Sequence, residues 1–130
     1  MAVDLTPRLA TGRTLIESYG KGGFRIAGQR YENSVLVLPT EVHAWPVAAI
    51  ADITAQSLAP LLGQGGGRAP VEILLLGCGA RFAMIPAALR AELRAMGLRC
   101  DAMDTGAACR TYNVLLAEDR RVAAALIAID

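Results

Sequence analysis

The sequence predicts an α/β sandwich with a mostly parallel central sheet, preceded by a β-hairpin. The first observation is residues 71–76, where a run of aliphatic side chains stops at a glycine turn, as in a strand buried on both faces. The second is the amphipathic segment 86–96, which begins at Pro86 and is followed by Gly97, so it carries the start and stop signals of a helix. The third is the alternation of strand and helix patterns that continues to residue 129. A strand–turn–helix unit of this kind leaves a ligand-sized crevice at the carboxyl end of its strand.

The first third of the chain predicts the hairpin and a second buried strand. Residues 14–19 and 24–26 alternate apolar and polar side chains, and a glycine-rich turn separates them. Another turn leads to residues 30–31, which begin the return arm of the hairpin. Residues 35–38 are all aliphatic and stop at a proline, which indicates a second buried strand. Residues 41–51 show no clear pattern.

The rest of the chain predicts alternating helices and strands. Asp52 opens a short helix with apolar side chains, and Pro60 spoils its last turn. Residues 63–67 are rich in glycine and predict a flexible loop. Beyond the helix at 86–96, the predicted elements are a strand at 99–103, a helix at 106–118 capped by Asp104 and Thr105, and a strand at 122–129.

Length and charge bound the class of protein. The 130 residues predict one domain, residues 14–130, behind a flexible N-terminal arm, residues 1–13. A net charge of +1 gives no field that would steer the chain onto nucleic acid, so we expect no nucleic-acid partner. No apolar run is long enough to cross a bilayer, so we expect no membrane insertion.

The cysteines and the histidine bound the redox compartment and the metal chemistry. Cys78, Cys100 and Cys109 are an odd number without CxxC spacing, which favours reduced thiols and a cytoplasmic location. Together with the single histidine, His43, they provide no local ligand spacing of the zinc type. We therefore expect no metal and no cofactor.

The crevice after residues 71–76 is the first candidate site, and it would take an anionic metabolite. A short helix connects the strands at 71–76 and 99–103, so these strands should lie side by side. Their carboxyl ends would then bring together backbone amides of the glycine turn, two helix N-termini and arginine side chains, all of which favour an anion. The candidate ligand residues are Gly77, Cys78, Gly79, Arg81, Asp104, Thr105, Arg110, Tyr112 and Asn113.

Magnitudes limit this anion hypothesis. A helix end contributes about 0.3–1 kcal/mol and a charge-assisted hydrogen bond about 1.5–3 kcal/mol, against an association cost of several kcal/mol. A bare anion would therefore bind no better than about millimolar, and Asp104 already occupies part of the positive potential. The alternative is that the glycines only let the chain turn and the helix pack closely. Nucleotide binding has little support, because the turn is neither GxGxxG nor a Walker sequence.

Cys78 is a second candidate, as a nucleophile or a redox-sensitive thiol. A thiol in a glycine turn near a helix N-terminus and Arg81 has the setting in which a thiolate is stabilised. Cysteine catalysis normally needs a base, and the one histidine, His43, lies in a region without a predicted element. The alternative is a small buried cysteine.

Three further residues have structural explanations. Tyr112 can face the sheet with Cys109 at helical spacing. Asn113 lies beside that apolar stripe, so its amide is expected to bond backbone near the end of the central strand or to face a cleft. Trp45 is expected to fill an edge of the core.

Several of these stretches resemble a widespread family of small α/β domains of unknown function. The motifs are GGFRI at 22–26, SVLVLP at 34–39, LLGCG at 75–79, MDT at 103–105 and ACRTYN at 108–113. The family includes mitochondrial complex I assembly factor 3 and an adipogenesis-associated human protein. The resemblance covers about residues 14–128 and implies a three-layer α/β domain with a β-hairpin attached to a mixed sheet, in which one strand is antiparallel to the rest. It implies no established catalytic activity and no required cofactor.

Position by position, the resemblance weakens the catalytic hypothesis. Relatives often have threonine at the position of Cys78, which suits a small turn residue better than an obligatory nucleophile. Relatives also vary at the position of Arg110, which puts a shared anion ligand in doubt.

The sequence therefore leads to three functional hypotheses. The first is a non-enzymatic interaction or assembly factor that resembles the complex I assembly factor, with protein partners, compatibility with homo-oligomers, and contact surfaces at the hairpin (20–28) and near Tyr112. The second is an anionic-metabolite binding module at the crevice. The third is a Cys78-dependent hydrolase or redox enzyme.

Overall fold

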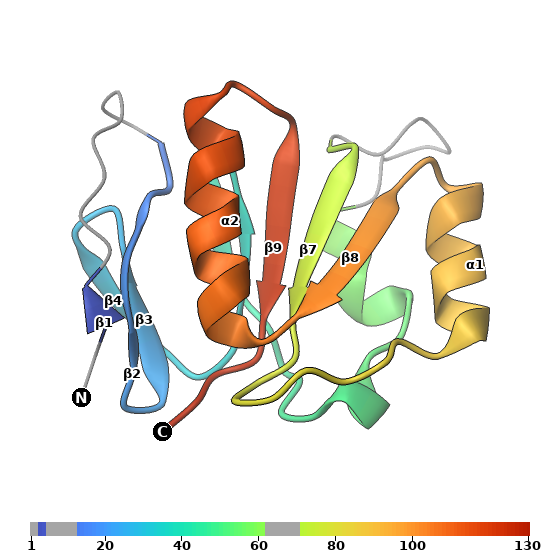
Figure 1. Cartoon of the computed structure of the whole chain (residues 1–130), viewed down its shortest axis with the longest axis horizontal. Coiled ribbons are helices and arrows are strands. Elements are labelled where there is room, and N and C mark those ends of the chain that lie inside the picture. Colours follow the sequence, from blue (N-terminus) through green and yellow to red (C-terminus); the bar gives the residue numbers. More distant parts are fainter. Residues whose placement is uncertain (1–2, 5–12, 62–70) are drawn as a thin grey trace.

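The computed structural model describes residues 3–4, 13–61 and 71–130, and its centre is a five-stranded sheet in the order β6-β5-β9-β7-β8. Figure 1 shows helix α2 (Thr105–Ala117) in front of this sheet and helix α1 (Ala87–Ala95) beyond β8. The strands are β5 (Val35–Leu38), β6 (Glu41–Ala44), β7 (Ile73–Gly77), β8 (Arg99–Met103) and β9 (Val122–Leu126).

The directions of the strands make this sheet mixed. β7 is parallel to both β8 and β9. β5 is antiparallel to β9 on one side and to β6 on the other. Among the five strands, β5 alone therefore opposes the common direction, and the predicted mixed, mostly parallel sheet is confirmed.

A second sheet of four antiparallel strands forms the N-terminal part, in the order β1-β2-β3-β4. Its two hairpins have two-residue turns with positive φ at both positions, Lys21-Gly22 (55° and 77°) and Ala27-Gly28 (50° and 82°). These are the turns whose twist matches that of the flanking strands. The predicted hairpin is thus confirmed, within a larger sheet. Its strands are β1 (Val3–Asp4), β2 (Ile16–Gly20), β3 (Gly23–Ile26) and β4 (Gln29–Glu32).

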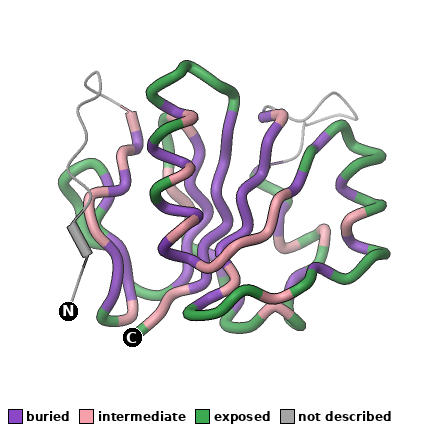
Figure 2. Tube along the Cα trace, in the orientation of Figure 1, coloured by how far each residue is buried: buried purple, intermediate pink, exposed green. Residues whose placement is uncertain are grey.

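Alternate residues of the buried strands face two different layers, which is why β7 is apolar throughout. Leu74 and Leu76 belong to a core cluster that includes Leu89 and Leu93 of α1. Ile73 and Leu75 belong to the opposite cluster with α2 and the small sheet. Figure 2 shows the resulting pattern, with buried strands between helices whose outer surfaces are exposed. The three-layer architecture is confirmed.

The sequence signals at both ends of α1 and at the start of α2 are confirmed in the structure. Pro86 is the N-cap of α1, and Gly97 follows its end with φ of 82°. Asp104 is the N-cap of α2, and its side chain accepts the N–H of Ala107 at 2.9 Å.

The segment between β5 and β7 differs from the prediction. Residues 41–44, where no pattern was seen, form the edge strand β6. The predicted short helix is instead a 3₁₀ segment, η2 (Gln56–Leu61), and a second 3₁₀ segment, η1 (Ile50–Asp52), precedes it. Pro60 inside η2 cannot donate a helical hydrogen bond, and Leu58 has non-helical angles, so a regular α-helix does not form.

Two predicted flexible segments fall largely outside the described residues. The loop at 63–67 lies wholly outside them. Of the arm at 1–13, the structure describes β1, which pairs with β2, and Arg13. The Arg13 guanidinium donates to Asp119 Oδ1 and to the Leu116 carbonyl, both at 3.3 Å.

Candidate functional site

The predicted crevice lies where the ends of β7, β8 and β9 meet the start of α2. β7 and β8 are neighbours in register, with Gly77 opposite Met103, as expected from the short connection between them. α1 and α2 leave these two strands toward opposite faces of the sheet. This arrangement is the topological switch point at which α/β sheets commonly bind ligands.

Internal hydrogen bonds use the amides of this crevice. The N–H of Cys78 donates to the Met103 carbonyl at 2.8 Å, and the N–H of Gly79 donates to Thr105 Oγ1 at 2.9 Å. The Thr105 hydroxyl, which is fully buried, donates in turn to the Ile127 carbonyl at 2.7 Å. An anion would have to compete with these bonds for the amides.

The glycines have separate steric roles. A Cβ on Gly77 would lie 3.0 Å from Thr105 Cα and 3.0 Å from Leu126 Cδ2, so only glycine lets α2 approach the strand end this closely. Gly79 has φ of 101°, a backbone conformation that side chains rarely adopt. These positions agree with the alternative in which the glycines let the chain turn and the helix pack.

The structure brings together only part of the predicted ligand set. Residues 77–79 and the capping pair Asp104 and Thr105 meet at the strand ends, and Arg81 follows in an exposed loop. Arg110 is exposed on α2, where its guanidinium donates to Tyr19 Oη of the small sheet at 3.4 Å. The anion site at this crevice stays a prediction.

Tyr112 and Asn113 do not face the crevice. They instead bond to Thr14 and Ile16 and so hold the small sheet against α2. Tyr112 is fully buried with its hydroxyl 2.7 Å from Thr14 Oγ1, and burial raises its pKa well above the usual range. Asn113 accepts the N–H of Ile16 at 3.0 Å and donates to the Ile16 carbonyl at 2.9 Å. The expected bond to backbone is present, but its partner is β2 rather than the end of the central strand. A contact surface formed by Tyr112 is excluded, because its side chain has no exposed area.

Cys78 is half-buried, and its thiol donates to the Ala83 carbonyl at 3.4 Å. His43 lies on β6, which β5 and β9 separate from β7, so roughly 14 Å of sheet lies between the two strands. His43 therefore cannot act directly as a base for Cys78. Burial raises the pKa of Cys100 to about 11 and that of Cys109 to about 12, so both stay protonated at neutral pH.

The loop that connects β7 to α1 presents apolar side chains to solvent, a feature missed in the sequence. Phe82 is 58% exposed and Met84 is 75% exposed, and exposed Arg81 precedes them. The sequence signal for this surface was the pair of large apolar side chains in a loop beside a glycine turn. Exposed loops are usually polar, so apolar residues there indicate a contact surface. The thiol of Cys78 donates to the Ala83 carbonyl and so links this loop to the end of β7.

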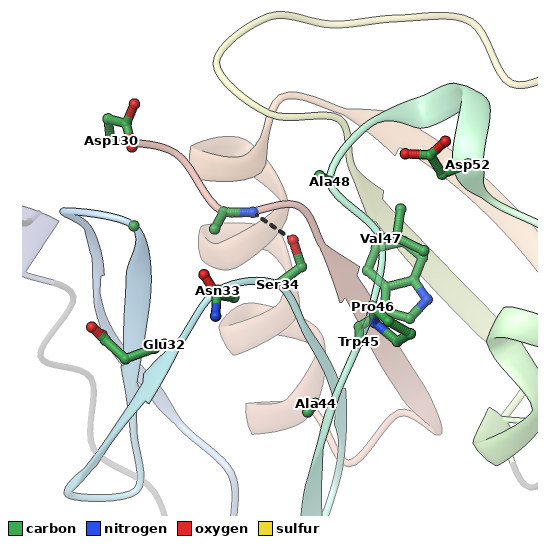
Figure 3. Close-up of a pocket in the computed structure, with 12 residues that line it drawn as sticks. Glu32, Asn33, Ser34, Ala44, Trp45, Pro46, Val47, Ala48, Asp52 and Asp130 are labelled. Atoms are coloured by element: carbon green, nitrogen blue, oxygen red, sulfur yellow. Dashed lines mark hydrogen bonds between the residues drawn. The ribbon is translucent and has the colours of Figure 1, made fainter.

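A cavity of about 780 Å³ opens between the two sheets, near the residues that follow β9 (Figure 3). Trp45, Pro46 and Val47 line one side of it, and Glu32 and Asp130 lie on the other. Trp45 is buried and donates its indole N–H to the Ser57 carbonyl at 3.1 Å, so it fills the core edge as expected. The N–H of Ala128 donates to Ser34 Oγ at 3.0 Å and ties the end of the chain to the β4–β5 turn.

Neither a metal cluster nor a spanning helix is found in the part of the chain that the structure describes. Its His, Cys, Asp and Glu side chains form no group of three or more that could hold a metal ion. None of its helices has the length and apolar character needed to cross a bilayer.

The fold and site define a small three-layer α/β domain with an attached antiparallel sheet. At its topological switch point the amides of Cys78 and Gly79 bond to other groups of the protein. Over residues 16–127 the chain matches the family described as protein of unknown function (DUF498/DUF598), and it belongs to that family. The resemblance seen in the sequence is thereby confirmed.

Relatives with known sequences include bacterial and vertebrate proteins. An uncharacterized protein of Rhodobacter capsulatus is 40% identical over 89% of this chain and 86% of its own length. NADH dehydrogenase (ubiquinone) 1 alpha subcomplex assembly factor 3 of Danio rerio is 36% identical over 97% of this chain and 71% of its own length. The human protein of the same name is 33% identical, and the match covers 96% of this chain and 66% of that protein.

Solved structures have the same fold. A protein of Bartonella henselae described as an outer membrane protein has a TM-score of 0.81 and 37% identity, covering 92% of this chain and 98% of its own. A Bordetella pertussis protein described as an Mth938-like domain has a TM-score of 0.77 and 35% identity, covering 96% of this chain and 92% of its own.

Proposed function

We propose that this protein is a non-enzymatic interaction factor that helps to assemble a multi-subunit complex, as the names of its vertebrate relatives state for NADH dehydrogenase. Identities of 33–36% over nearly the whole chain support this proposal. The complex is either respiratory complex I or another membrane complex. The interaction takes place at a surface of the folded domain, without chemistry at the crevice.

The exposed loop 81–84 is the observation that carries this proposal. Phe82 and Met84 place large apolar side chains in water at the carboxyl edge of the sheet. Aromatic residues, methionine and arginine are enriched at protein interfaces, and the loop combines all three types. The polar groups beneath it bond to one another, so the loop offers a contact surface rather than reactive groups.

The test is affinity purification after in-cell crosslinking, from soluble and membrane fractions of cells that make this protein. We expect a defined set of subunits to be recovered with the wild type and lost with the Phe82→Ser/Met84→Ser double variant. Val114→Ser is the matched control, because Val114 is 56% exposed on the outer surface of α2. Recovery of the protein alone, or equal loss in the control, would contradict the proposal.

An anionic-metabolite module at the crevice of residues 77–81 and 104–113 is the alternative, and it has less support because the amides of Cys78 and Gly79 already donate internally. A thermal-shift panel of anionic metabolites and nucleotides tests it. Stabilisation by a member of the panel, lost in Arg81→Ala, would favour the module over the interaction factor.

A Cys78-dependent reaction is the third hypothesis. The thiol of Cys78 is half-buried, whereas Cys100 and Cys109 are buried, so iodoacetamide should modify Cys78 first. Loss of cellular function in Cys78→Ser would support a reaction that depends on the Cys78 thiol. We expect that variant to function normally, because serine fits the turn and can still donate to the Ala83 carbonyl.

A further inference from the structure

The outer edge of β8 is a second region of the surface that the crevice and the exposed loop do not include. Among the described strands β8 pairs only with β7, so its other side is an edge of the five-stranded sheet. The N–H of Arg99 donates to the Glu72 carbonyl at 2.9 Å, and the carbonyl of Met103 accepts the N–H of Cys78 at 2.8 Å. Since backbone groups alternate along a strand, those of Cys100 and Ala102 point away from β7.

Helix α1 forms one wall of a groove along this edge. The groove has a volume of about 530 Å³ and lies between α1 and β8. The Arg90 guanidinium crosses it and donates to the Cys100 carbonyl at 3.3 Å. This contact confirms that the Cys100 carbonyl points outward, and it leaves the Cys100 amide and both backbone groups of Ala102 directed to the edge.

The charge of the groove is positive. Arg90 and Arg94 lie one turn apart on α1, and Arg99 begins β8. The carboxylate of Asp101 is 4.0 Å from Arg99 Nε, too far for a hydrogen bond, and it neutralises only part of this charge. Arg94 is exposed and Arg99 has 77% of its side chain exposed, so both guanidinium groups are available to a partner.

We propose that an acidic, extended segment of a partner protein docks in this groove and adds to the edge of β8. Its backbone would pair with the outward groups of Ala102. Carboxylates on alternate residues would lie on the α1 side of the added strand and bind Arg94, while Arg99 adds positive charge from the other side of β8. The proposal rests on the interaction role proposed above and names the chemistry of one partner segment. A strand supplies side chains to one face at every second residue, so acidic residues at every second position would all lie on the α1 side of the edge.

The first test is an NMR titration of the isotope-labelled full chain with a synthetic peptide in which glutamate and valine alternate. We expect amide shift changes confined to residues 90–102, and none with the corresponding lysine–valine peptide. Arg94→Glu should weaken binding by about tenfold or more, as loss of one charge-assisted bond implies. Arg120→Glu is the matched control, an equal charge change in the α2–β9 turn, and it should leave affinity unchanged.

Two further probes separate strand addition from simple charge attraction. A peptide with N-methyl groups on the amides that face β8 should bind far more weakly than the unmodified peptide, because it cannot pair with the edge. Inorganic phosphate should not reproduce the peptide's shifts. Equal binding of the methylated peptide, the same shifts with phosphate, or equal weakening by Arg94→Glu and Arg120→Glu would each overturn the proposal.

The crosslinking experiment distinguishes failure of this inference from failure of the interaction role. If subunits are recovered with wild type and equally with Arg94→Glu and Arg99→Glu, the interaction role stands and the β8 groove is wrong. If the charge reversals remove a subset of the recovered proteins while Arg120→Glu does not, the groove is a docking site.

Discussion

The two faces of the central sheet are covered in different ways. On the α2 face, buried polar side chains join three elements: Asn113 bonds to both backbone groups of Ile16, and Tyr112 meets Thr14, which also bonds to the Leu38 carbonyl. On the α1 face, packing is mainly aliphatic, through Leu89 and Leu93. The position of the small sheet against α2 therefore depends on directional hydrogen bonds, whereas α1 is held on the sheet by apolar contact.

This contrast has an energetic reason. Apolar contact between a helix and a strand is non-directional, so it stabilises burial without requiring one particular pairing of atoms. A separate antiparallel sheet has several ways to lie against a helix. Fixed hydrogen bonds from Asn113 and Tyr112 select one of them, because any other arrangement would leave buried polar groups without partners. Three substitutions at neutral pH, taken from the largest expected effect to the smallest, and one alkaline titration test this difference.

Replacing Asn113 should have the largest effect. Asn113→Leu keeps the volume but leaves the buried N–H and carbonyl of Ile16 without partners, so we expect a loss of about 3 kcal/mol in the free energy of unfolding. Leu93→Met on the α1 face also conserves volume and should cost less than about 1.5 kcal/mol. Urea unfolding followed by circular dichroism measures both. Equal losses would mean that the two faces do not differ.

Thr105 should come next, because it joins both faces at the strand ends. Thr105→Val conserves shape but removes the acceptor for the Gly79 N–H and the donor to the Ile127 carbonyl, for an expected loss of about 2 kcal/mol. Thr111→Val, on the same helix and half-buried, serves as control and should change stability by less than about 0.5 kcal/mol. A loss in the control as large as that in Thr105→Val would show that the bonds are not responsible.

Alkaline titration compares one cysteine from each face. Burial raises the pKa of Cys109 to about 12 and of Cys100 to about 11, from an ordinary value of 9.0. A raised folded-state pKa means that stability is complete below pH 9 and is lost as the pH rises toward the folded value, by up to about 1.4 kcal/mol per pH unit for each thiol. Unfolding at pH 8–11 should therefore show a decline above pH 9 that is less steep in Cys109→Ala and in Cys100→Ala than in the wild type. A decline unchanged in both variants would contradict the assignment.

The smallest effect is expected for the hydroxyl of Tyr112. Tyr112→Phe removes its contact with Thr14 Oγ1, while Thr14 keeps its bond to the Leu38 carbonyl, so we expect a loss of about 1 kcal/mol. Tyr31→Phe is the control, since its hydroxyl makes only a long 3.5 Å contact with Gln29. Thermal unfolding of the pair measures the difference, and no difference would remove Tyr112 from the set of docking bonds.

Much of the fold could be predicted from the sequence, because the strongest signals came from buried elements. The aliphatic runs of β5, β7 and β9 are too apolar to lie at a surface, so they predict buried strands. The caps of α1 and α2 depend on neighbouring residues alone, so the sequence shows them directly. β6 was missed because it is an edge strand whose side chains are exposed or half-buried, so it has no alternation to detect. The apolar spacing of Leu58 and Leu61 predicts a helix, but Pro60 and the non-helical angles of Leu58 limit this segment to the 3₁₀ turns of η2.

The candidate site was harder to predict, for a physical reason. The sequence placed residues 77–79 and the pair Asp104 and Thr105 at one sheet edge, and they meet there. Whether their amides face a ligand or an internal acceptor depends on the tertiary approach of Met103 and Thr105, which accept the N–H groups of Cys78 and Gly79, and local pattern does not determine that approach. The position of Asn113 against β2 depends on how a separate sheet docks, which is a long-range contact.

The order of strands has a consequence for synthesis of the chain on the ribosome. β9 lies between β5 and β7, with Val35 opposite Leu126 and Ile73 opposite Val122. Until residues 122–126 have been translated and released, the earlier strands share no ladder that joins them into one sheet. The aliphatic edges of β5 and β7 therefore stay unpaired until β9 is available. A nascent chain stalled before β9 would expose both edges to chaperones.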